Sequence, residues 1–149
     1  EHGPVTLETL RHLVLATRGL PAVPIARVPA GETWMAKRVL DQGVHGVVFP
    51  FMRTPEMAQQ AAQACRYPPR GRRGSGAGLA EGTWPTVASY FDSADEQVLV
   101  VVVIEEAEAV ERCEEIAAID GIDVLFVGTS DLSFSMGYRG NLSHPDVLK

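Results

Sequence analysis

Two wholly apolar runs, each followed by an abrupt change to polar residues, constrain the fold of this 149-residue chain more than any other feature. VLVVVVIE (98–105) and DVLFVG (123–128) lack the alternation of a strand with one wet face. Such continuous runs are typical of parallel strands that are covered on both faces. Residues 106–121 lie between them, show helical periodicity and end at Gly121. This unit predicts an α/β protein with a parallel sheet.

The remainder of the chain repeats the same strand and helix alternation. Thr6 is expected to cap a helix that ends at Gly19, and Thr54 followed by Pro55 predicts another helix start. The other expected elements are a strand at 22–29, a helix at 33–43, a strand at 46–50, and an irregular loop at 67–84 with a possible short strand near Arg72. A repeat of roughly 25 residues fits a (β/α) barrel, although an open doubly wound sheet shares this rhythm.

The length predicts only part of a barrel. A closed (β/α)8 barrel has eight units and typically about 250 residues, whereas this chain supplies about six units. We therefore expect residues 1–149 to form one partial TIM barrel that lacks the first strand and the eighth strand with its helix. On this interpretation the chain is a segment of a longer protein.

Composition argues against several classes of partner. The net charge of −6 provides no general attraction for phosphate backbones, and the arginines at 66–73 form only a local basic cluster, so no nucleic-acid partner is expected. No apolar run approaches the roughly 20 residues of a membrane helix. The N-terminal residues lack the pattern of a secretory signal, and the two cysteines lack metal-binding spacing. We expect a cytoplasmic protein without a membrane partner.

Four polar residues fall at the carboxyl ends of expected strands, the face on which parallel barrels build active sites: His2, Arg27, Glu105 and Asp131. Either acid alone is compatible with a simpler role, as a helix cap or as the start of a loop. Together, two carboxylates at the ends of apolar strands suit a hard divalent ion such as Mg²⁺. A histidine on the same rim is suited to proton transfer, and an arginine in an apolar strand usually meets an anion.

Several motifs, in order along nearly the whole chain, resemble the HpcH/HpaI-type class II pyruvate aldolases, metal-dependent (β/α)8 barrels related to macrophomate synthase. The motifs are EHGP, ARVP, KRVLDQGVHGVVFP, TPEMA, YPPRGRRG, IEE, GIDVLFVGTSDLSFSMG and HPDV. The resemblance implies that Glu105 and Asp131 ligate Mg²⁺, Mn²⁺ or Co²⁺. It also implies that backbone amides at Gly128 and Ser130 hold the substrate carboxylate.

The same resemblance implies roles for three further residues. His2 matches the general base, and Asp41 matches the acid that strengthens this base. Arg27 matches the residue that contacts the pyruvate oxygen and stabilises the enolate. Val103 stands where the family usually has a glutamine that touches substrate.

The implied function is a carbon-carbon lyase that cleaves or forms 4-hydroxy-2-oxoacids through a metal-bound pyruvate enolate. Its partners would be pyruvate or oxaloacetate, an aldehyde and further copies of the chain, since relatives form hexamers. Two alternatives remain open at this stage. One is decarboxylation of oxaloacetate, or other enolate chemistry, at the same site, and the other is a non-catalytic barrel fragment that only associates with partner subunits.

Overall fold

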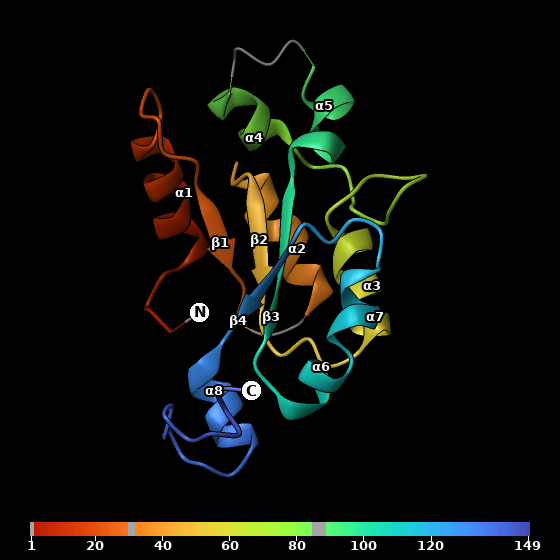
Figure 1. Ribbon diagram of the computed structural model, residues 1–149. Coiled ribbons are helices and arrows are strands. Elements are labelled where there is room, and N and C mark those ends of the chain that lie inside the picture. Colours follow the sequence, from red (N-terminus) through yellow and green to blue (C-terminus); the bar gives the residue numbers. More distant parts are fainter. Residues whose placement is uncertain (1, 30–31, 85–88) are drawn as a thin grey trace.

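The computed structural model describes residues 2–29, 32–84 and 89–149. Glu1, the first residue of the EHGP motif, lies outside them. The described part contains a four-stranded parallel sheet in the order β1-β2-β3-β4, so each strand lies beside its neighbour in sequence (Figure 1). The strands are β1 (Ile25–Arg27), β2 (Gly46–Phe49), β3 (Leu99–Ile104) and β4 (Val124–Val127). The expected α/β class with a parallel sheet is confirmed.

Eight helices lie in the described residues, and two of them begin at the threonine caps expected from the sequence. The Thr6 hydroxyl accepts a hydrogen bond from the amide of Thr9, and the Thr54 hydroxyl accepts one from the amide of Met57. The helices are α1 (Leu7–Ala16), α2 (Thr33–Asp41), α3 (Pro55–Ala64), α4 (Gly78–Thr83), α5 (Tyr90–Gln97), α6 (Ala107–Glu111), α7 (Cys113–Ala117) and α8 (Thr129–Ser135). No helix among these described residues is long and apolar enough to cross a membrane.

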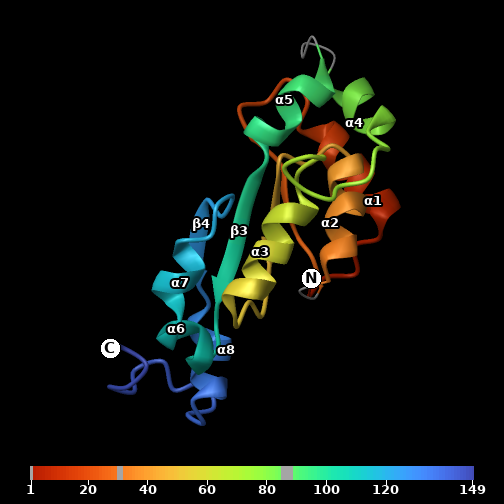
Figure 2. The same cartoon turned by 90° about the vertical axis from the view of Figure 1, so that its right-hand side faces the viewer.

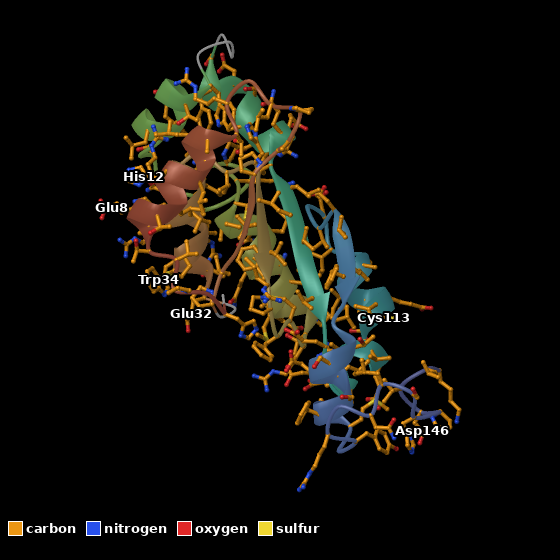
Figure 3. All side chains as sticks on the ribbon, turned by 90° about the vertical axis from the view of Figure 1, so that its left-hand side faces the viewer. Glu8, His12, Glu32, Trp34, Cys113 and Asp146 are labelled. Atoms are coloured by element: carbon orange, nitrogen blue, oxygen red, sulfur yellow. The ribbon has the colours of Figure 1, made fainter. Side chains whose placement is uncertain are left out.

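The core lies between the sheet and the helices α2, α3 and α7 (Figure 2). Its centre consists of fully buried valines of β2 and β3, packed against small residues of α2 and α3. These buried residues are Val47, Val100, Val102, Ala36, Ala58 and Ala61. The outer surfaces of the helices carry polar or large exposed side chains, such as Glu8 and His12 on α1 and Trp34 on α2 (Figure 3). This amphipathic pattern explains why the helices cover the sheet.

The structure differs from the expected elements in four places. The strand expected at 22–29 is limited to Ile25–Arg27, in keeping with the prolines on either side, which cannot donate to a ladder. The loop expected at 67–84 contains α4, and no strand forms near Arg72. The helix expected at 106–121 is divided at Arg112 into α6 and α7. The helix α5 was not expected.

β4 is much more exposed than its sequence predicts. Phe126 is 56% exposed and Val127 57% exposed, although both belong to a continuous apolar run. β4 pairs with β3 along one edge and is the last strand in the described sheet. The expectation of burial on both faces is therefore wrong for this strand as the structure shows it.

Candidate active site

The carboxyl ends of the four strands meet at one edge of the sheet, at the lower end of the strands in Figure 1. Arg27 is the last residue of β1, Glu105 directly follows β3, and Gly128 directly follows β4. Ile104 is paired with Val127, so the residues that follow these two strands are neighbours. The sheet therefore brings three of the expected site residues to a single edge.

Glu105 is buried and held on two sides. The residue is 4% exposed, and its Oε1 accepts a hydrogen bond of 2.7 Å from the backbone amide of Phe51. Gly128 lies on the other side, where a Cβ atom would stand 2.8 Å from Oε2. A hydrogen bond from an amide to a carboxylate is stronger than one between neutral groups. These two contacts define the orientation of the carboxylate.

Asp131 lies in the first turn of α8, the helix that follows β4, and is exposed. The N-cap of α8 is Gly128, and no side chain caps this helix end. Asp131 is therefore not the cap residue that its position suggested. A carboxylate in the first turn is favoured by the helix dipole. Because Gly128 touches Glu105, both acids belong to the same corner of the sheet edge.

The donor set at this corner fits a hard divalent cation. Mg²⁺ is usually held by one or two carboxylates, with water and substrate in its other positions. Glu105, which follows β3, and Asp131, in the first turn of the helix after β4, would supply two carboxylates. Among the described residues, no group of three or more histidine, cysteine or acidic side chains is arranged to hold a metal ion.

The two expected carboxylate-binding amides differ in availability. The amide of Gly128 donates to the carbonyl of Ile104 at 2.9 Å, so it is engaged in the sheet. The main contribution of Gly128 in this structure is the space that it leaves for Glu105. Ser130 is the second residue of α8, where amides have no acceptor within the helix.

Arg27 and the segment that carries His2 lie close together. Gly3 and Arg27 line the same groove, of about 300 Å³, together with residues of α1 and α2. Arg27 and His2 are both exposed. The groove thus places Arg27 beside the segment that carries His2, and the shared rim of these two side chains stays a prediction.

Asp41 lies elsewhere. It is the last residue of α2, just before β2 begins, and therefore sits near the amino ends of the strands, opposite the edge that carries Glu105. Its Oδ1 lies 3.1 Å from Nη2 of Arg73, whose side chain is only 1% exposed. Nη2 also donates to the Tyr90 hydroxyl, at 3.1 Å. The structure thus does not bring Asp41 together with the other expected site residues of the same chain.

Arg73 also contacts an aromatic ring of its own motif. The guanidinium lies over the ring of Tyr67, at 4.6 Å from its centroid. Burial raises the pKa of Tyr67 to about 12. Both residues come from the YPPRGRRG motif, which is thereby shown to contribute to packing against α2 and α5.

The chain matches the family model described as HpcH/HpaI aldolase/citrate lyase over residues 1–149. It is 40% identical over 149 residues to a hydroxypyruvate/pyruvate aldolase of Roseobacter denitrificans, covering 99% of this chain and 58% of the relative. It is also 40% identical to a 5-keto-4-deoxy-D-glucarate aldolase of Escherichia coli, covering all of this chain and 58% of that relative. The chain therefore spans about 58% of the length of these relatives.

Solved structures agree with this result. The crystal structure of an HpcH/HpaI aldolase/citrate lyase family protein from Burkholderia cenocepacia J2315 matches with a TM-score of 0.88 and 37% identity, over 99% of this chain and 60% of that one. Macrophomate synthase shares the fold, with a TM-score of 0.79 at 23% identity over 99% of this chain and 54% of its own. The protein belongs to the HpcH/HpaI aldolase/citrate lyase family, as its motifs predicted.

Proposed function

We propose that the whole protein is a metal-dependent class II aldolase, a carbon-carbon lyase that cleaves or forms 4-hydroxy-2-oxoacids. The observation that carries this proposal is the environment of Glu105. Glu105 is a buried acid at the carboxyl edge of a parallel sheet, held by the Phe51 amide and faced by Gly128, and these features support a role as a metal ligand. Two relatives at 40% identity are named aldolases, which supports the same activity.

Glu105 and Asp131 would hold the divalent ion, which we take to be Mg²⁺, Mn²⁺ or Co²⁺. When bound, such an ion supplies a Lewis acid that polarises a carbonyl oxygen. Asp131 is exposed and therefore accessible to an ion, whereas Glu105 is buried and held by the amide of Phe51. The preference for a hard cation follows from the two carboxylates.

Arg27 and His2 would act on the pyruvate part of the substrate. The guanidinium of Arg27, at the end of β1, is suited to the oxygen on which negative charge develops as the enolate forms. His2 lies on the segment beside Arg27 and would accept the methyl proton. The amide of Ser130, in the first turn of α8, would bind the substrate carboxylate.

Asp41 would not act on His2 of its own chain. Its contact with Arg73, near the amino ends of the strands, separates it from the His2 segment. An action of Asp41 on His2 would therefore require a second copy of the chain. We accordingly propose a cytoplasmic homo-oligomer whose small-molecule partners are pyruvate, or oxaloacetate, and an aldehyde.

Release of pyruvate from a 4-hydroxy-2-oxoacid tests this function. We expect the complete protein to release pyruvate in the presence of Mg²⁺. This release should stop in EDTA, and Glu105→Gln should abolish it. Glu106→Gln is the matched control, because Glu106 is the adjacent acid and pairs with Arg53 at 3.3 Å. Release of pyruvate only from oxaloacetate would indicate a decarboxylase instead. A protein without either activity and without metal binding would support the non-catalytic alternative.

A further inference from the structure

Phe51 has an unusual backbone conformation at the candidate site. Its φ angle is +56°, in the left-handed region that residues with a side chain rarely adopt. Phe51 follows β2 by two residues and stands between Phe49 and Met52, which are 0% and 1% exposed. These two buried side chains anchor the chain on both sides. A strained conformation persists only where the surrounding structure enforces it, and such positions cluster at functional sites.

The left-handed turn directs the amide of Phe51 toward the neighbouring strand. That amide donates to Oε1 of Glu105 at 2.7 Å, while the other oxygen, Oε2, lies against Gly128. The ring of Phe51 is 38% exposed, so burial of the side chain does not account for the conformation.

We propose that Phe51 is a positioning residue, whose left-handed main chain orients the Glu105 carboxylate for the divalent ion. The inference rests on the metal role proposed above for Glu105. Hydrogen-bond partners of a ligating carboxylate fix its orientation, and their loss typically weakens metal binding by about 10- to 100-fold. Nothing in the family motifs assigns this task, since the group involved is a backbone amide and not a side chain.

Two substitutions separate the main chain from the ring. Phe51→Asn and Phe51→Val both remove the ring, but asparagine tolerates the left-handed region, whereas a β-branched residue does not. We would measure the dissociation constant of Mn²⁺ by calorimetry in the complete protein without substrate. Wild type, Phe51→Asn and Phe51→Gly should bind about equally, and Phe51→Val should bind about 10- to 100-fold more weakly.

The melting temperature of the metal-free protein shows whether each variant is folded. If Phe51→Val does not fold, Phe51→Ala replaces it, compared with Phe51→Gly. These two variants differ by one methyl group, which disfavours the left-handed conformation. Weaker Mn²⁺ binding by the alanine variant is then the expected result.

Two results would overturn the positioning role of Phe51 and leave the metal role of Glu105 intact. Equal affinity of Phe51→Val and Phe51→Asn would show that the main-chain conformation does not position Glu105. Equal losses in the Asn, Gly and Val variants would assign the effect to the ring. If wild-type protein and Glu105→Gln bind Mn²⁺ equally, the metal role of Glu105 fails, and this inference fails with it.

Discussion

Gly128 stands so close to Glu105 that a single added carbon on the glycine would lie 2.8 Å from Oε2 and 2.9 Å from Cβ of the glutamate. Real Cβ atoms essentially never approach this closely, so a larger residue at position 128 forces a shift. The absence of a side chain at the end of β4 therefore maintains the position of a carboxylate at the end of β3.

Gly128→Ala should therefore displace the Glu105 carboxylate and weaken binding of Mn²⁺. Overpacking of this kind costs about 1–3 kcal/mol of unfolding free energy, so the variant should remain folded. Calorimetric titration with Mn²⁺ and urea unfolding measure the two effects. Gly82→Ala is the control, because Gly82 lies in α4 with no atom within 4 Å of an added Cβ. Unchanged affinity in Gly128→Ala would contradict the proposed role of this contact.

Asp41→Asn should destabilise the fold by about 3 kcal/mol, because it leaves the buried charge of Arg73 without its carboxylate. The Arg73 side chain is 1% exposed and lies 3.1 Å from Asp41. Urea unfolding measures the change. Glu96→Gln removes one partner of the exposed pair between Arg70 and Glu96 and should cost less than about 1 kcal/mol. Equal losses of unfolding free energy in the two variants would show that the buried Arg73–Asp41 pair contributes no more than the exposed pair.

The two cysteines should differ in reactivity. Cys65 is fully buried, and burial raises the pKa of its thiol to about 12, whereas Cys113 on α7 is partly exposed (Figure 3). Because the thiolate is the reactive form, iodoacetamide at about pH 8 should label Cys113 in the native protein and Cys65 only after denaturation. Peptide mass spectrometry identifies the labelled residue. Labelling of both thiols at the same rate in the native protein would be inconsistent with this burial.

Protonation of His45 should lower the free energy of unfolding in mild acid. Burial lowers the pKa of His45 from its ordinary value of 6.5. Between 6.5 and the lower pKa of the folded state, the unfolded chain binds more protons, so the free energy of unfolding falls as the pH falls through this window. His45→Gln should show a shallower decrease than wild type in urea unfolding between about pH 7 and pH 5. The exposed His12→Gln is the control, and equal slopes in wild type and His45→Gln would refute the prediction.

The sequence predicted those elements whose signals are local. The apolar run at 98–105 formed β3, and the threonine caps Thr6 and Thr54 started α1 and α3. The regions that were not predicted depend on contacts distant in sequence. The position of α4, for example, is tied to the indole of Trp84, which donates to the carbonyl of Gly43 at 2.8 Å. The position of α5 is likewise tied to Tyr67, whose amide donates to Oδ1 of Asp95 in that helix at 2.9 Å.

The sequence allowed side chains of the candidate site to be predicted, but not its backbone contacts. Glu105 follows one apolar strand and Arg27 ends another. Because the carboxyl ends of parallel strands share one edge, their proximity could be inferred. The amide of Phe51 could not be inferred, since every residue except proline has one and only the backbone angle directs it. Family motifs also did not show that Asp41, at the end of a helix, lies near the opposite ends of the strands.

Exchange of the methyl protons of pyruvate in D₂O tests the central claim most directly, because it requires enolate formation and no aldehyde. We predict that the complete protein removes the methyl proton signal when Mg²⁺ is present. The exchange should stop in EDTA, in Glu105→Gln and in Asp131→Asn, and it should be severely slowed in Arg27→Lys, since an ammonium group lacks the planar fork of arginine. Glu106→Gln should exchange as wild type does. Exchange that proceeds equally fast in EDTA would contradict the proposed aldolase mechanism.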